Sequence, residues 1–210
     1  MDKKIRLRFS KQEKLRFIGH LDFLRVFQQM IRRAGLPIAY SQGFNPHQII
    51  SFALPLPLGM ESINDYADIT IAAEITPAEI VQTLNAAAPQ GLLVQAATPY
   101  EGQNAAAATI VADYSFAEKV SPESVNKILS AETLVIPKKT KSGLKNTDIR
   151  PDILDITVTD HVQMRLSAGS MKFLNPLLVA ELLTGEKACN SSLSRVELYR
   201  KNDNNELTPL

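Results

Sequence analysis

The chain has 210 residues, of which 45% are hydrophobic, 21% are charged and one is a cysteine. This composition fits one large or two small globular domains with an ordinary core, and it excludes an internal disulfide. No apolar run approaches the roughly 18 residues of a membrane span. The opening MDKKIRLRF lacks the apolar stretch of a secretory signal, so we expect a cytoplasmic protein that does not enter a membrane.

The net charge of +1 hides a segregation of charge along the chain. Residues 1–60 carry ten Lys/Arg against three Asp/Glu, whereas residues 61–136 carry two against ten. Residues 137–172 are basic again, with seven against four. The two basic stretches can supply one positively charged face for a polyanion. Ordinary solvated surface charge is the alternative.

The first half of the chain alternates predicted strands and helices. Residues 3–9 alternate apolar and basic side chains, which is typical of a strand with one wet face. A helix is expected at 21–34, ended by Gly35 and Pro37. Its apolar positions are Leu21, Leu24, Phe27, Met30 and Ile31. Further strands are expected at residues 15–18, 37–41, 48–54, 67–73 and 92–100, with a second, capping-box helix at 76–87. The LPLPLG run at 54–59 reads as an edge or a covering loop.

The second half repeats this order of elements. Strands are expected at 109–116, 133–138, 152–160, 162–169 and 194–200, and helices at 121–131 and 174–185. The basic residues 138–151 are expected to form a loop, and the polar residues after 201 a frayed end. Each half reads β-α-β-β-α-β. The sequence therefore predicts an α+β protein of two tandem ferredoxin-like (βαββαβ) subdomains, residues 1–100 and 109–202, joined by a small-residue linker at 101–108.

Two stretches of the first half carry the residues best suited to a ligand. One is GHLD, with His20 and Asp22 at the mouth of the first helix. The other is the loop SQGFNPH, residues 41–47, whose glycine, neutral polar groups and aromatic ring suit a nucleobase or a sugar phosphate. A helix cap and a plain hairpin turn are the structural alternatives. The predicted substrate-binding residues are His20, Asp22, Arg25, Arg32, Arg33, Ser41, Gln42, Gly43, Phe44, Asn45, His47, Lys139, Lys141 and Arg150.

The patterns of common enzyme sites are missing from the sequence. The three histidines show no metal-ligand spacing, so we expect no metal. No phosphate-binding glycine motif or nucleophile elbow occurs. No catalytic residue is assigned, and His20 and His47 are the only candidates for acid and base chemistry.

The segment LRFIGHLDFLRVFQQMIRRAGLPIAYSQGFNPHQIISFALPLPLGMES, residues 15–62, resembles the signature of the DUF2344 family, also described as radical-SAM-associated proteins. The stretches KSGLKNTDIRP and SRVELYR are similar to later landmarks of that family. The resemblance implies a separately encoded radical SAM partner that carries the iron–sulfur cluster and S-adenosylmethionine. This chain has one cysteine, so it is expected to bind neither cofactor itself.

The leading hypothesis is an accessory protein that binds RNA or a nucleotide-like substrate for a radical SAM enzyme. In it, Arg25, Arg32, Arg33, Lys139 and Lys141 hold phosphates and the loop at 41–47 holds the specific group. One alternative is a stand-alone RNA-processing hydrolase that uses His20 and His47. Another is a protein-interaction subunit without nucleic acid, which docks its partner on the LPLPLG run. Whether the chain is itself an enzyme stays open, and we expect no activity of the chain alone.

Overall fold

A computed structural model of the chain describes residues 2–140, 143–170 and 172–210. Its fold is mixed α+β, as the sequence predicts. The first half contains β1 (Lys3–Lys11), α1 (His20–Arg33), β2 (Ile50–Phe52), β3 (Glu61–Ile71), α2 (Pro77–Ala87) and β4 (Leu92–Pro99). The remainder contains α3 (Ala105–Ala108), β5 (Val111–Phe116), α4 (Pro122–Ser130), β6 (Val135–Thr140), β7 (Gly143–Asp148), β8 (Ile153–Val158), β9 (Val162–Ser167), α5 (Pro176–Thr184), β10 (Leu193–Lys201) and β11 (Leu207–Pro209).

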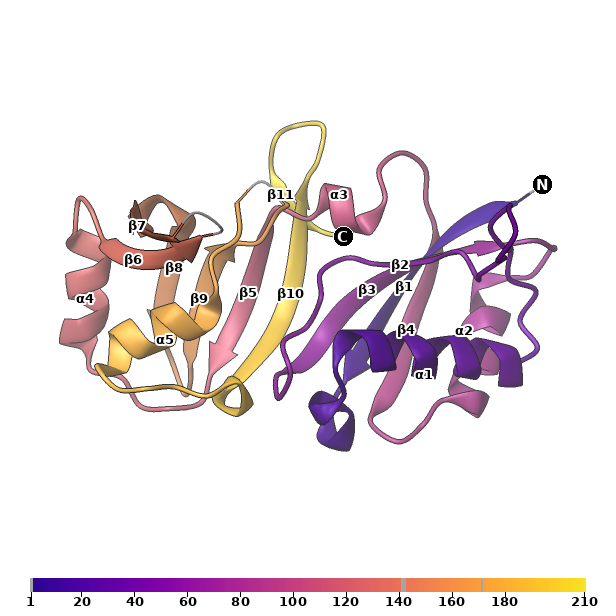
Figure 1. Cartoon of the computed structure of the whole chain (residues 1–210), viewed down its shortest axis with the longest axis horizontal. Helices are drawn as coiled ribbons and strands as arrows, with labels where there is room; N and C mark the ends of the chain where they lie inside the picture. The colour runs from indigo at the N-terminus through magenta and orange to yellow at the C-terminus, as the bar shows by residue number, and fades with distance from the viewer. Residues whose placement is uncertain (1, 141–142, 171) are drawn as a thin grey trace.

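Nine of the described strands form one mixed sheet that runs through both halves of the molecule (Figure 1). The strand order is β4-β1-β3-β10-β5-β9-β8, with β2 beside β3 and β11 beside β10. Most neighbours are antiparallel, but β3 and β10 pair in parallel at two positions, Glu61 with Ser194 and Ser62 with Arg195. We call this junction the seam, because it joins a strand of the first half to a strand of the second.

The helices bury the sheet through two groups of apolar side chains. In the first half, the alternating residues Ile5, Leu7 and Phe9 of β1 pack with buried side chains of α1 and α2. In the second half, buried residues of α4 and α5 pack on β5, β8 and β9. Leu56 and Met60, which precede β3, belong to the second group. The LPLPLG run therefore covers the seam, as a loop between β2 and β3.

Several elements of the first half differ from the sequence prediction. The strand expected at 15–18 is wrong: Glu13–Phe17 is a 3₁₀ helix, because the chain turns out of the sheet at Glu13, whose φ is 53°. Residues 37–41 make only isolated bridges. The apolar side of α1 is also offset from the predicted one. Phe23 is buried while Leu21 is 70% exposed, because the helix turns Phe23, Phe27, Met30 and Ile31 toward the sheet.

Two segments of the second half are more ordered than expected. The basic stretch expected as a loop contains an antiparallel hairpin, in which β6 pairs with β7. The tail expected to fray forms β11, whose residues pair with the end of β10. Both segments satisfy backbone groups that a loop would leave to water. No helix in the described ranges is long and apolar enough to cross a membrane.

Candidate functional site

The loop at 41–47 is closed by hydrogen bonds between its first residue, Ser41, and its last, His47. The Ser41 N–H donates to the His47 carbonyl over 2.8 Å, and the His47 N–H donates to Ser41 Oγ over 3.1 Å. Ser41 Oγ also lies 2.8 Å from His47 Nδ1. Gly43 has a φ of 130°, which a residue with a side chain rarely adopts. The loop thus needs its serine, histidine and glycine for its shape.

This closure leaves two groups of the loop available to a ligand. Because Ser41 Oγ engages Nδ1 of His47, Nε2 is the ring nitrogen left for a ligand. Phe44 stands at the tip of the loop with its side chain fully exposed, at 104% of the reference value. An aromatic ring that packs on nothing is a ready stacking surface for a flat ligand.

A pocket of about 180 Å³ lies between this loop and the second half of α1. Gln28 and Arg32 line it from the helix, because residues four apart share one helix face. The chain around the loop supplies the other walls, which are Tyr40, Pro46, His47 and Gln48. We call this space the loop pocket. It combines a guanidinium, an imidazole, a phenol and two amides.

Gln48 is the unusual residue of the loop pocket. Its side chain is 5% exposed, and neither Oε1 nor Nε2 has a hydrogen-bond partner among the described residues. A buried amide without partners is costly, because it has lost its hydrogen bonds to water. Both atoms are inaccessible to water, so a ligand in the loop pocket would satisfy them only after the Gln48 side chain turned toward it.

The other arginines predicted to hold phosphates are engaged elsewhere. Arg25 forms an exposed ion pair with Asp22 over 2.7 Å. Arg33 donates to the Ala87 carbonyl over 2.8 Å and so completes the end of α2. The loop residues Gln42 and Asn45 are exposed beside the pocket but do not line it. Of the predicted arginines on α1, the structure brings only Arg32 to the loop pocket.

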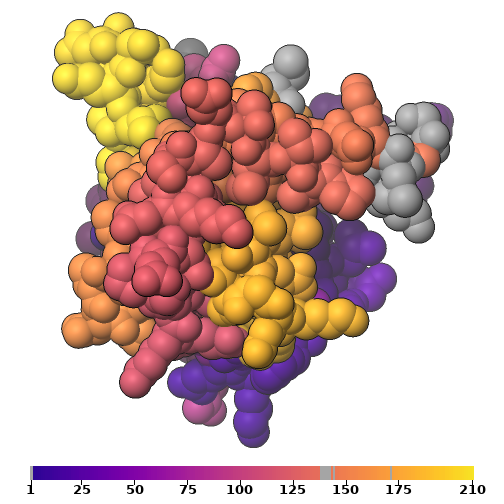
Figure 2. Space-filling model, turned by 90° about the vertical axis from the view of Figure 1, so that its left-hand side faces the viewer, coloured from indigo at the N-terminus to yellow at the C-terminus, as the bar shows by residue number. Residues whose placement is uncertain are grey.

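The later basic residues lie far from this pocket. Figure 1 places β6 and β7 at the opposite end of the molecule from α1, and Figure 2 shows the hairpin above α4 and α5 at that end. Lys139 is on β6, opposite Leu144, and Lys141 lies outside the described residues. Arg150 donates to the carbonyls of Leu129 and Ile153 over 2.8 Å each, so it holds the end of α4. The helix that carries Arg32 and the hairpin that carries Lys139 therefore lie at opposite ends of the molecule.

His20 lines a second, much smaller cavity at the other end of α1. This space of about 10 Å³ has room for about one water molecule, and we call it the lysine cavity. Its walls are Lys11, His20, Phe23, Phe52, Leu54, Leu56 and Asp65. The His20 ring meets Phe52 edge-on, with 5.6 Å between ring centroids. His20 and Arg32 are twelve residues apart on α1, about 18 Å along the axis, so His20 and His47 serve different cavities.

Lys11 is a buried cation, with 1% of its surface exposed. Its ammonium donates to the Ile18 carbonyl over 2.8 Å and lies 4.7 Å from the centre of the Phe23 ring. Burial lowers the pKa of Lys11 from 10.5 to about 8; Asp65 raises this pKa and Arg195 lowers it. Lys11 is therefore the cation that lines the lysine cavity, and its pKa of about 8 is lower than that of an exposed lysine.

Arg195 connects the lysine cavity to the seam. It is completely buried, and its guanidinium pairs with Asp65 over 2.5 Å. It also donates to the carbonyls of Leu54 and Pro55, over 2.9 and 3.4 Å. One side chain of β10 thus fixes both β3 and the LPLPLG run of the first half.

Sequence reasoning missed several residues that line the two cavities, namely Lys11, Gln28, Tyr40, Gln48 and Asp65. Tyr40 and Gln48 flank the predicted loop directly, and Gln28 stands one helical turn before Arg32. Lys11 continues the inward alternation of Ile5, Leu7 and Phe9, which is a signal for a buried lysine. Asp65 gave no such signal, because its partner Arg195 is distant in sequence.

Comparison with known proteins identifies a family but no function. The family model described as "Uncharacterized protein conserved in bacteria (DUF2344)" matches residues 4–176. A search of curated proteins found no match. Among solved structures, an unknown protein from Galdieria sulphuraria is 13% identical over 88% of this chain and 89% of that chain, with a TM-score of 0.29. A likeness at that score supports no statement about this chain.

Proposed function

The chain belongs to the DUF2344 family. We propose that it binds a nucleotide-like group, free or within RNA, in the loop pocket. The observation that carries this proposal is the lining of the loop pocket, which brings the Arg32 guanidinium, the His47 imidazole and the Gln28 amide together, with the unpartnered amide of Gln48 buried behind them. A nucleobase edge offers an acceptor and a donor side by side, and amide side chains pair with such edges. Arg32 would contact the phosphate, and the exposed Phe44 ring would stack on a base.

We further propose that the ligand is a substrate presented to a separate radical SAM enzyme. This step rests on the family resemblance and on the single cysteine of the chain, which cannot ligate an iron–sulfur cluster alone. The partner would supply the cluster and S-adenosylmethionine. Leu58 is a suitable contact for such a partner, because it is 58% exposed while Leu56 is buried. Leu58→Asp should therefore weaken capture of the partner enzyme in a pull-down and leave the fold intact.

As to architecture, we propose that each half is a ferredoxin-like unit. In support, the strands of the first half stand in the order β4-β1-β3-β2, and those of the second half in the matching order β10-β5-β9-β8. The β6–β7 hairpin is then an insertion between α4 and β8 of the second unit.

The proposal is tested by titrating the protein with the four nucleoside 5′-monophosphates and with a labelled single-stranded RNA. Calorimetry and fluorescence anisotropy give the dissociation constants at two or more salt concentrations. Arg32→Gln should weaken binding about tenfold and reduce its salt dependence. Arg25→Gln is the matched control, because it removes the same charge from the same helix outside the loop pocket.

Two outcomes would contradict the proposal. One is the absence of binding for every probe at millimolar concentration. The other is an equal loss of affinity in Arg32→Gln and Arg25→Gln, which would mean that the helix attracts polyanions through its net charge alone. RNA cleavage by the isolated chain, lost on His20→Ala or His47→Ala, would instead favour the hydrolase alternative.

A further inference from the structure

A third hollow lies on the face of the sheet opposite α1 and α2. Because side chains alternate along a strand, the burial of Ile5, Leu7 and Phe9 turns Arg6 and Arg8 to this other face. The pairing register sets Arg6 between Asp68 of β3 and Thr98 of β4. It sets Arg8 between Tyr66 and Ala96.

The hollow exists because β3 and β10 separate after their two paired positions. Beyond Ser62 and Arg195, the two strands are joined by hydrogen bonds of side chains and no longer by backbone hydrogen bonds. Asn64 donates to the Val196 carbonyl over 3.1 Å, and the Tyr66 hydroxyl donates to Glu197 over 2.7 Å. The end of the chain lies beside this opening, where Leu210 N–H donates to the Leu198 carbonyl over 3.1 Å. The space left is about 230 Å³.

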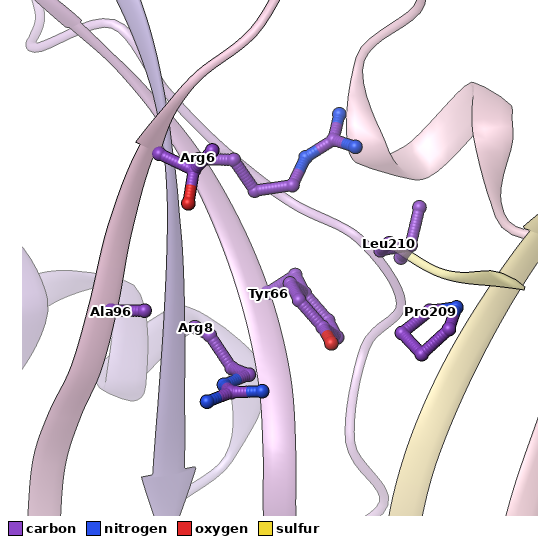
Figure 3. A pocket seen from close by; sticks show the side chains of 7 residues that line it. Arg6, Arg8, Tyr66, Ala96, Pro209 and Leu210 are labelled. Atoms are coloured by element: carbon purple, nitrogen blue, oxygen red, sulfur yellow. The ribbon is translucent and has the colours of Figure 1, made fainter.

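Figure 3 shows the walls of this hollow, which we call the seam pocket. They are Arg6, Arg8, Tyr66, Ala96, Thr98, Pro209 and Leu210. The two arginines are the only charged side chains of the lining, and both are positive. Thr98 adds a hydroxyl, while Ala96, Pro209 and Leu210 form an apolar wall.

The two arginines differ in the hydrogen bonds and ion pairs that they already form within the protein. Arg6 is buried and makes two hydrogen bonds to Asp68, over 2.8 and 3.1 Å, and a third to the Gln103 carbonyl. Its charge is therefore balanced. Arg8 is exposed and forms no ion pair with any described carboxylate. Figure 3 shows its guanidinium beside the Tyr66 ring, at the mouth of the hollow.

Tyr66 adds no negative charge to the seam pocket. Burial, followed by the hydrogen bond to Glu197, raises the pKa of Tyr66 well above its usual value, so its hydroxyl stays protonated. The hydroxyl donates its hydrogen bond to Glu197. Arg8 interacts with Tyr66 and with the nearby Glu197 carboxylate, but it forms no ion pair with a described carboxylate, so it is the cation of the seam pocket that is open to a further anion.

We propose that the seam pocket binds a small organic anion, a carboxylate or a phosphate ester, that carries a short apolar group. Arg8 pairs with the acidic group, Thr98 donates a hydrogen bond to it, and Ala96, Pro209 and Leu210 contact the apolar part. A volume below the roughly 300–1,000 Å³ of drug-sized pockets limits the ligand to a small molecule. The site lies on the opposite face of the sheet from α1, so it does not depend on the function proposed for the loop pocket.

Calorimetric titration of the full chain with benzoate, phenyl phosphate and inorganic phosphate tests the seam pocket. Benzoate and phenyl phosphate distinguish the two acidic groups, inorganic phosphate lacks the apolar part, and benzamide lacks the charge. We expect one of the two aromatic anions to bind at least tenfold more tightly than inorganic phosphate and benzamide. Arg8→Gln should weaken that binding at least tenfold, and Ala96→Leu, which fills the hollow without changing charge, should abolish it.

Lys4→Gln is the matched control, because Lys4 is an exposed cation on the same face of the same strand and does not line the seam pocket. Its affinity should stay within twofold of the parent. An equal loss in Lys4→Gln, full affinity in Ala96→Leu, or no binding of either aromatic anion at about 10 mM would each overturn the proposal. Thermal melting of each variant verifies that it is folded, and Thr98→Val replaces Arg8→Gln if the latter does not fold.

Discussion

Replacing Gln48 with methionine should make the protein more stable and less able to bind its ligand. The side chain is 5% exposed, and its amide donor and acceptor are both unpartnered. Each unsatisfied buried polar group costs about 1–3 kcal/mol. Methionine has a similar length, carries no such groups and adapts to irregular spaces. We therefore expect Gln48→Met to raise the free energy of unfolding by about 1–3 kcal/mol, or Tm by roughly 2–12 °C for a chain of this size.

Urea denaturation and thermal melting measure this change, and nucleotide titration measures the accompanying loss of affinity. Gln29→Met is the control, because Gln29 is exposed on α1 and its replacement should change stability by less than about 0.5 kcal/mol. If Gln48→Met lowers stability by 1 kcal/mol or more, the amide is satisfied in the free protein. The reasoning that assigns it to a ligand would then be refuted.

Three further predictions concern the buried charges and the loop tip. Arg195→Met should lower the free energy of unfolding by about 3–5 kcal/mol in urea titrations, because the buried carboxylate of Asp65 then loses its ion pair; adding Asp65→Asn should recover a large part of the loss. The unfolded chain binds the Lys11 proton up to pH 10.5 but the folded chain only to about pH 8, so the stability should rise by roughly 1–2 kcal/mol between pH 8 and 9.5, and this rise should vanish in Lys11→Met. Phe44→Ala should leave Tm unchanged, since the ring packs on nothing, yet weaken RNA binding by about 1–3 kcal/mol in anisotropy titrations.

Local signals in the sequence predicted the elements whose causes are local. The alternation of β1 predicted its strand, and the capping box of α2 is present with both of its bonds, between Thr76 and Glu79. The loop at 41–47 was predicted as a candidate site because its glycine, neutral polar groups and aromatic ring suit a nucleobase or a sugar phosphate. Whether it binds a ligand stays a prediction.

Features that depend on distant partners could not be predicted in the same way. The burial of Lys11 depends on Asp65 and Arg195, and the pairing of β3 with β10 leaves no trace in the periodicity of either strand. The same limit applies to the predicted basic face. Charge counts along the chain say nothing about where a stretch lies in space, and the fold places Arg32 and the β6–β7 hairpin at opposite ends.

The parallel pair at the seam also sets the order in which the molecule can be assembled. Residues 61–62 must wait for residues 194–195, about 130 positions later in synthesis. Contacts of such separation raise the contact order and slow folding, because a long loop must close before they form. In the meantime the part of β3 that precedes its pairing with β2 presents an open edge, which another chain could join. Asp65 stands on that edge as an inward-pointing carboxylate, and such a charge discourages strand addition. Asp65, which pairs with Arg195 in the folded protein, thus also discourages aggregation before β10 has been synthesised.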